Sequence, residues 1–72
     1  MTTQTGITVT ANGKAHTLQA GTLLPAFIEA IGLAPERVVV EHNGEALTQK
    51  EARGVTLQDG DTLEIVRIVA GG

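Results

Sequence analysis

Near its end the chain reads Leu57-Gln-Asp-Gly-Asp-Thr-Leu-Glu-Ile-Val66, and this stretch decides the fold. Asp59-Gly60-Asp61 is a turn signal, and the alternation after it predicts a strand over Thr62–Ile68 with Leu63 and Ile65 inward. We expect this last strand to run down the middle of a sheet, parallel to the first strand. Parallel pairing needs a long crossover, which the roughly forty intervening residues supply.

The beginning of the chain predicts a β-hairpin. Ile7–Ala11 alternates apolar and polar residues, as a strand with one buried face does. Asn12-Gly13 follows, a dipeptide typical of two-residue hairpin turns, and leads into a returning strand over Lys14–Leu18. The side chains that we expect to face the core are Ile7, Val9, Ala11 and Leu18.

A helix is predicted next, because the apolar residues change to the spacing of a one-faced helix. Thr22 is the expected N-cap, and Pro25 falls in the first turn, where a backbone N–H would have no partner. Gly32 fits the left-handed position that ends a helix. The face expected to be buried carries Leu24, Phe27, Ile28 and Ile31.

The second half predicts another hairpin, in which Arg37–His42 leads through Asn43-Gly44 into a short strand over Glu45–Leu47. Thr48–Gly54 is polar and predicts a turn of α- or 3₁₀-helix. Two hairpins flanking one main helix, closed by a central strand, predict an α+β protein with a ββαββ mixed sheet and a tail, which is the β-grasp arrangement. We expect one domain over residues 1–72, with a disordered extension over 1–5 and a flexible tail over 69–72.

The composition excludes several classes of function. Because the chain has no cysteine, it has no disulfide, no thiol nucleophile and no cysteine-ligated zinc or iron–sulfur cluster. Its single Phe27 and its five basic residues, scattered in a chain of net charge −3, argue against a nucleic-acid surface. No apolar run reaches the roughly 20 residues of a membrane span, and the first residues do not resemble a signal peptide. We therefore expect a cytoplasmic protein that is monomeric when free.

The chain ends on Val69-Ala-Gly-Gly72, directly after the last predicted strand. Gly71 and Gly72 have no side chains, so the reactive group is the carboxylate of Gly72. At roughly 3.3 Å per residue, this segment reaches about 13 Å, which would carry the carboxylate into the active site of another protein. Glycine passes through a narrow channel and adopts any backbone angles that the channel imposes. The alternative is an ordinary frayed terminus.

Several segments, read in their order along the chain, resemble a known family. These are Val9–Gly13, Gly21–Leu24, Val38–Gly44, Leu57–Val66 and Ile68–Gly72. With them the chain is similar to the ubiquitin-like sulfur carriers, and specifically to the ThiS family of thiamine biosynthesis, over residues 6–72. Pro25 and Phe27 depart from the more usual acidic and leucine-rich first helical turn, and the polar extension over residues 1–5 is not part of the pattern.

The resemblance implies a carrier that acts as a co-substrate rather than an enzyme. A ThiF-type adenylyltransferase, using ATP and Mg²⁺ that it binds itself, would convert the carboxylate of Gly72 into an acyl-adenylate. A persulfide derived from a cysteine desulfurase would then displace AMP and leave a thiocarboxylate, which makes Gly72 a 1-thioglycine. A ThiG-type thiazole synthase would accept the sulfur. The chain lacks glycine-rich nucleotide-binding motifs, and we expect it to bind no cofactor, metal, nucleic acid or membrane itself.

Two alternatives stay open at this point. The first is a sulfur carrier of another pathway, either the small subunit of molybdopterin synthase or a carrier for cysteine biosynthesis. The molybdopterin subunit is usually longer and richer in aromatic residues. The second is a ubiquitin-like protein modifier that forms isopeptide bonds. All of these use the same activated tail and differ in the nucleophile that takes the acyl group.

The outward side chains of the last strand predict a docking face beside the tail. If Leu63 and Ile65 face the helix, the residues between and after them face outward, as do alternate residues of the neighbouring strand. An exposed apolar patch beside a reactive tail favours a contact with the activating enzyme and the sulfur acceptor. The residues predicted to bind partners are Val39, Glu41, Glu64, Val66, Ile68, Val69 and Ala70, and those predicted to react are Gly71 and Gly72.

The remaining polar residues are predicted to have structural or surface positions. His42 has the inward parity of Val38 and Val40, and we expect it at a strand end with its polar edge in solvent. Asp59 and Asp61 are expected to form the turn before the last strand, because a calcium site needs further ligands. Lys14 and Lys50 are expected to be ordinary solvated lysines.

Overall fold

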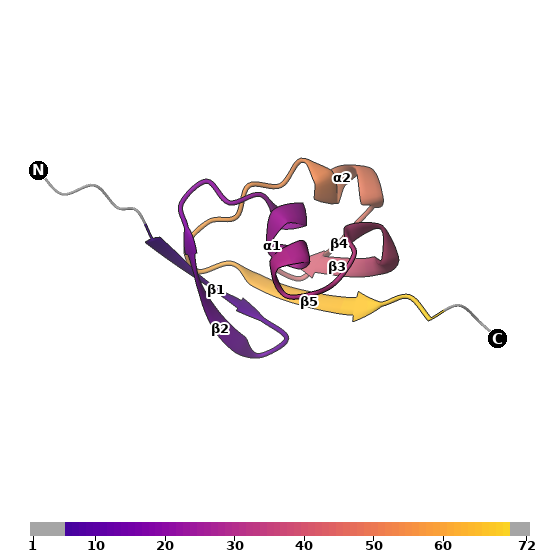
Figure 1. Ribbon diagram of the computed structural model, residues 1–72, viewed down its shortest axis with the longest axis horizontal. Helices are drawn as coiled ribbons and strands as arrows, with labels where there is room; N and C mark the ends of the chain where they lie inside the picture. Colours follow the sequence, from indigo (N-terminus) through magenta and orange to yellow (C-terminus); the bar gives the residue numbers. More distant parts are fainter. Residues whose placement is uncertain (1–5, 70–72) are drawn as a thin grey trace, which may run out of the picture.

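The computed structural model of the protein describes residues 6–69, and its strands form one sheet in the order β2-β1-β5-β3-β4 (Figure 1). The strands are β1 (Gly6–Ala11), β2 (Lys14–Gln19), β3 (Val38–His42), β4 (Glu45–Leu47) and β5 (Thr62–Arg67). The helices are α1 (Leu24–Ala30), the 3₁₀ turn η1 (Pro35–Arg37) and α2 (Gln49–Arg53). The extension predicted over residues 1–5 and residues 70–72 of the predicted tail lie outside the described residues.

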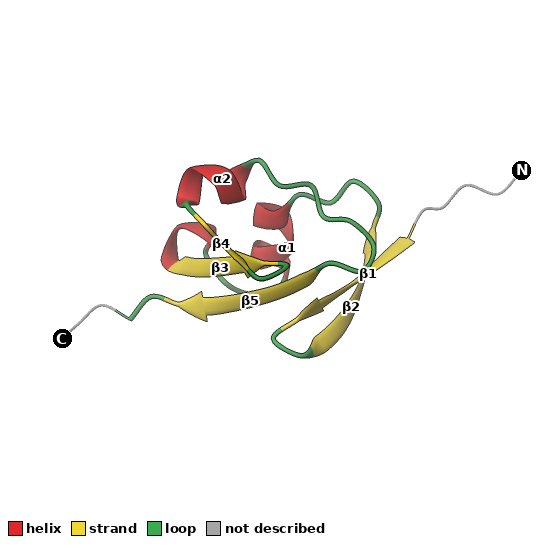
Figure 2. Cartoon of the chain, turned by 180° about the vertical axis from the view of Figure 1, so that it is seen from behind, coloured by secondary structure: helices red, strands yellow, loops and turns green. Residues whose placement is uncertain are grey.

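The central strand of the sheet is β5, as predicted. It lies parallel to β1, with Thr10 opposite Thr62 and Ala11 opposite Leu63, and antiparallel to β3 on its other side. This arrangement confirms the β-grasp prediction. The element order within the described residues is ββαββαβ, which adds α2 and the central strand to the ββαββ core. The chain between β1 and β5 contains the other three strands as well as the helices, and α1 and α2 lie on one side of the sheet (Figures 1 and 2).

Both predicted hairpin turns are present. Asn12 and Gly13 have φ angles of 51° and 80°, and Asn43 and Gly44 have φ angles of 52° and 86°. Positive φ at both central residues is what a type I′ turn requires, and its twist matches that of the flanking strands. The dipeptide Asn-Gly therefore set the position of both turns correctly.

The start of α1 differs from the prediction that Thr22 caps it. The N-cap is Leu23, which has an extended backbone and makes no side-chain capping bond. The hydroxyl of Thr22 instead donates to the carbonyl of Gln19 at 2.6 Å, within the turn that leaves β2. The Thr22 hydroxyl is therefore directed at the turn and does not accept a hydrogen bond from a backbone N–H of the first helical turn. Pro25 lies in the first turn as expected.

The end of α1 agrees with the prediction. Gly32 has a φ angle of +89°, and its N–H donates to the carbonyl of Glu29 at 3.0 Å. The N–H of Leu33 donates to the carbonyl of Ile28 at 3.1 Å. These two bonds form the Schellman pattern that closes helices at a left-handed glycine.

The polar segment Thr48–Gly54, predicted as a turn of α- or 3₁₀-helix, contains the short α-helix α2. Its N-cap Thr48 and Glu51 form a capping box, in which each side chain accepts a hydrogen bond from the other residue's backbone N–H. The side-chain amide of Gln49 donates to the carbonyl of Val38 at 2.9 Å, which ties the helix to β3.

The core lies between the sheet and α1 and contains the inward residues of all three central strands. Phe27, the largest fully buried side chain, makes an edge contact with the ring of His16 on β2, with centroids 5.1 Å apart. The predicted inward residues Leu18 and Ile31 are partly buried against this core. The buried residues are Ile7, Val9, Ala11, Leu24, Phe27, Ile28, Val38, Val40, Leu57, Leu63 and Ile65.

Candidate functional site

The predicted tail begins where β5 ends. The residues predicted to react, Gly71 and Gly72, lie outside the described residues, as does Ala70. One residue beyond the strand, the N–H of Ile68 donates to the carbonyl of Arg37 at 2.8 Å, and Val69 after it is 83% exposed. The sheet therefore holds the chain up to Ile68, and the next residue, Val69, is exposed.

The two faces of β5 differ sharply in exposure. Leu63 and Ile65 are 0% and 5% exposed, whereas Val66 and Ile68 are 61% and 53% exposed. The first pair packs in the core with α1, so the second pair lies on the opposite face of the sheet. The predicted inward and outward parity of this strand is confirmed.

The neighbouring strand extends this outer face. Register places Val39 of β3 opposite Val66, and Glu41 opposite Glu64. Val39 is 50% exposed, so it forms an open apolar pair with Val66. Like charges directly opposite each other destabilise a sheet, so the fold gains nothing from the glutamate pair. We call this surface the docking face, and it consists of Val39, Glu41, Glu64, Val66 and Ile68.

Two arginines that were not predicted as site residues lie at the root of the tail. Arg37 and Arg67 line an open hollow of about 310 Å³ together with Ile68 and Val69. Both arginines are exposed, and no carboxylate of residues 6–69 is within ion-pair distance of either guanidinium. Their proximity could have been expected from the sequence, because Arg37 precedes one strand and Arg67 ends another, and in an antiparallel pair the start of one strand lies beside the end of its partner.

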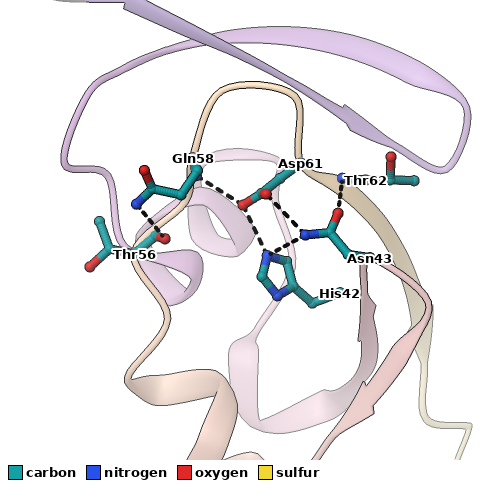
Figure 3. Close-up of polar contacts among 6 residues, drawn as sticks. All are labelled: His42, Asn43, Thr56, Gln58, Asp61 and Thr62. Carbon is teal, nitrogen blue, oxygen red and sulfur yellow. Dashed lines mark hydrogen bonds and ion pairs between the residues drawn. The ribbon is translucent and has the colours of Figure 1, made fainter.

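A cluster of polar side chains joins the end of β3 to the loop before β5 (Figure 3). Nε2 of His42 lies 2.9 Å from Oδ2 of Asp61, and the side-chain amide of Asn43 donates to Oδ1 of Asp61 at 3.1 Å. The backbone N–H of Gln58 donates to Oδ2 at 2.9 Å. His42 lies at the end of β3, as predicted, and its side chain is 22% exposed. Nε2 of its ring bonds to Asp61 rather than to solvent, because the fold brings the loop before β5 against it.

Asp61 is the one buried charged residue of the described chain, with 6% of its surface exposed. Burial by itself raises the pKa of its carboxyl. The hydrogen bonds from the backbone of Gln58 and the side chains of His42 and Asn43 outweigh burial and hold the pKa below its ordinary value. Asp61 therefore stays ionised and anchors the loop.

The turn prediction for the two aspartates is confirmed. Oδ1 of Asp59 accepts from the backbone N–H of Thr8 at 2.7 Å, which fixes the turn to β1. Within residues 6–69, no three histidine, aspartate or glutamate side chains are grouped so that they could hold a metal ion. In the same part of the chain, no helix is both long and apolar enough to cross a membrane.

Comparison with known proteins gives two kinds of relative. The ThiS family matches residues 6–72 of the chain. Thiazole synthases of Magnetococcus marinus and Paramagnetospirillum magneticum are 38% and 33% identical to it over 61 residues, which is 85% of this chain. The matched segment makes up 19% of each synthase, so the chain spans less than a fifth of the length of these relatives.

Two solved structures of thiamine biosynthesis proteins are also similar to the chain. The crystal structure of a ThiS protein from Geobacter metallireducens is 32% identical, covers 92% of this chain and all of its own, and has a TM-score of 0.75. The solution structure of a thiamine biosynthesis protein from the same organism is also 32% identical, with a TM-score of 0.70 over 92% of this chain and 88% of that one.

A computationally designed protein based on human erythrocytic ubiquitin has a TM-score of 0.54 at 24% identity, covering 93% of this chain and 95% of that one. At that identity the likeness concerns the fold alone, which is the ubiquitin-like β-grasp. Because the family match runs from β1 through the last residue of the chain, the protein belongs to the ThiS family.

Proposed function

We propose that the protein is a sulfur carrier of thiamine biosynthesis, which delivers sulfur from its C-terminal Gly72 to a thiazole synthase. The observation that carries this proposal is the similarity to a segment of two thiazole synthases. In those relatives, a segment like this chain is joined covalently to the rest of the synthase. Such a link holds a segment at high effective concentration beside its partner, which suits a donor that must reach one particular enzyme.

The chemistry takes place at the carboxylate of Gly72. A carboxylate is a poor electrophile, so an adenylyltransferase first transfers the AMP group of ATP to it and releases pyrophosphate. A persulfide sulfur of a partner protein then attacks the acyl carbon, and AMP leaves. A thiol of the partner cleaves the resulting acyl disulfide, so that a thiocarboxylate remains on Gly72 and a disulfide on the partner. The sulfur of the thiocarboxylate is then the nucleophile in thiazole formation.

This chain contributes position rather than catalysis. Val69 leaves the sheet in an exposed position, and the terminal glycines present no side chains to a narrow channel. The docking face lies beside this exit and offers Val39 and Val66 as an apolar contact. We infer that the adenylyltransferase and the synthase each bind this face while the tail enters their active sites. ATP and Mg²⁺ belong to the adenylyltransferase.

Intact mass tests the proposal. The chain is produced together with its adenylyltransferase and a persulfide donor, in cells that lack the thiazole synthase, so that the charged form accumulates. The mass should rise by the difference between sulfur and oxygen. Adding purified synthase with its other substrates should return the mass to that of the carboxylate form. The Gly72→Ala variant, treated identically, serves as the control and should keep the unmodified mass.

Two results would contradict the proposal in different ways. An unmodified mass accompanied by thiol-resistant conjugates on lysines of other proteins would identify a protein modifier. A charged form that keeps its sulfur with the thiazole synthase, but loses it to the enzyme of molybdopterin or cysteine biosynthesis, would assign the carrier to that pathway.

A further inference from the structure

We propose that Arg37 and Arg67 bind an acidic surface of the adenylyltransferase, at the mouth of the channel that receives the tail. The inference rests on the proposed function, because it specifies the chemistry of the partner that activates Gly72. We call these two residues the arginine pair.

The fold brings the arginine pair together from distant parts of the sequence. Arg37 directly precedes β3 and Arg67 ends β5, and the register places Val38 opposite Arg67. The hydrogen bond from Ile68 to the carbonyl of Arg37 closes this end of the sheet. Two of the five basic residues of the chain therefore line one hollow at the exit of the tail.

The stability of the fold does not require this arrangement. Two cations beside one hollow repel each other, and within the described residues neither guanidinium has a carboxylate partner. The nearest acidic residue in sequence is Glu36, which is exposed and forms no ion pair with either arginine. An exposed, unpaired guanidinium fork matches a carboxylate of another molecule, with which it can form two parallel hydrogen bonds.

Charge is also ordered along the strands β3 and β5. The arginine pair lies at the tail end and borders the docking face at Ile68, while Arg67 itself has the inward parity of Leu63 and Ile65. Val39 and Val66 lie in the middle of the docking face, and Glu41 and Glu64 lie beyond them. The chain as a whole has a net charge of −3, whereas the exit of the tail is locally positive. A partner surface complementary to it is acidic where the tail enters, and this polarity orients the carrier as it approaches.

The partner's protein surface fits this site better than the phosphate of the nucleotide does. Gly72 lies five positions beyond Arg67 in the sequence, and an extended segment of that length spans up to about 17 Å. An arginine side chain is far shorter than that. When the tail is extended in a channel, neither guanidinium reaches an adenylate on Gly72. The arginine pair instead meets the protein around the mouth of the channel.

The test measures how fast the full-length chain binds its purified adenylyltransferase, by biolayer interferometry at low and high salt, with adenylation followed in parallel by ATP–pyrophosphate exchange. The test variant is the double charge reversal Arg37→Glu/Arg67→Glu. The matched control is Lys14→Glu/Arg53→Glu, which changes net charge equally at exposed positions on β2 and α2, outside the hollow. Thermal unfolding checks that all variants fold, and Arg37→Gln/Arg67→Gln repeats the test with a smaller change of charge.

We expect the test variant to bind about tenfold more slowly at low salt and to lose the salt dependence of the wild type, while the matched control stays close to wild type. The adenylation rate at saturating carrier should be unchanged. Equal association rates for the test variant and the matched control would overturn the inference. So would a changed dependence on ATP concentration at an unchanged association rate, which would point to a phosphate contact. A defect confined to sulfur transfer into the thiazole synthase would assign the arginine pair to that enzyme and overturn the inference as well.

The parallel adenylation assay separates this inference from the proposed function. If the wild type is adenylated while the test variant binds like the control, only the role of the arginine pair fails. If the wild type is not adenylated by its cognate enzyme at any concentration, the proposed function fails, and the inference about the arginine pair fails with it.

Discussion

Asn12 and Ile65, which are 53 residues apart in the sequence, are joined by two hydrogen bonds. The N–H of Ile65 donates to Oδ1 of Asn12 at 2.7 Å, and Nδ2 of Asn12 donates to the carbonyl of Ile65 at 3.0 Å. Pairing of β1 with β5 extends through Thr10 and Ala11, where the hairpin turns away. The carboxamide of Asn12 therefore takes the place of one further strand residue beside β5.

The turn asparagine of the second hairpin also bonds to β5, from the side of β3. Asn43 also has a positive φ angle, and its Oδ1 accepts from the backbone N–H of Thr62 at 2.8 Å. Its Nδ2 donates to Asp61. The turn asparagines of both hairpins thus bond to β5, one on the side of β1 and the other on the side of β3. The central strand that leads to the tail is positioned from both neighbours.

Replacing Asn12 by glycine should destabilise the protein by about 1–3 kcal/mol, because glycine accepts the positive φ angle but leaves the N–H and the carbonyl of Ile65 without these partners. Asn12→Ala should cost more, because a β-carbon at this φ angle adds about 1–2 kcal/mol of strain. Urea unfolding of the three proteins gives the comparison. Equal stability of wild type and Asn12→Gly would show that the two hydrogen bonds contribute nothing.

The free energy of unfolding should decrease as the pH falls below about 4. The pKa of Asp61 in the folded protein is below its ordinary value of 3.8, so its carboxylate stabilises the fold above that value. This contribution is lost as the pH falls through the folded pKa. Asp61→Asn should lower stability by about 1–3 kcal/mol at neutral pH and should weaken the acid dependence. Urea unfolding between pH 3 and pH 7 measures both, with Asp59→Asn as the control on the same turn. An acid dependence equal in wild type and Asp61→Asn would assign it to other carboxylates.

The two faces of β5 should respond differently to substitution. Leu63→Ala removes a fully buried side chain and should cost about 2–5 kcal/mol. Val66→Asp and Ile68→Asp should each change stability by less than about 1 kcal/mol, because both side chains are more than half exposed. Both should weaken binding to the adenylyltransferase, because a charge placed in a contact that excludes water is costly. Normal binding by both aspartate variants would place the contact on another surface.

Removal of Gly72, or its replacement by alanine, should abolish adenylation. The truncated tail is shorter by roughly 3.3 Å, and alanine adds a β-carbon in the channel. Thermal unfolding should be unchanged, since the core residues lie between Ile7 and Ile65. ATP–pyrophosphate exchange with the cognate enzyme measures activation. A truncated chain that is still adenylated at the wild-type rate would rule out the carboxylate of Gly72 as the reacting group.

The sequence by itself determined the elements and their faces. Asn-Gly dipeptides located both turns, alternation located the inward residues Leu63 and Ile65, and Gly32 located the end of α1. Each of these signals acts within a few residues, through backbone angles or through the period of a strand or helix, so it can be recognised without knowledge of the fold. The parallel pairing of the first and last strands was also predicted, because parallel neighbours need a long connection and the chain between these two strands is long enough to form one.

The tertiary structure alone decided which distant polar groups meet. The bond between His42 and Asp61 spans 19 residues, and the bonds between Asn12 and Ile65 span 53. The hydroxyl of Thr22 was misassigned to the helix, because it can bond equally well to a turn on its other side. Arg37 and Arg67 become neighbours through the register of β3 against β5. Strand order and register are set by the burial of the whole apolar face, and no short segment of the chain carries that information.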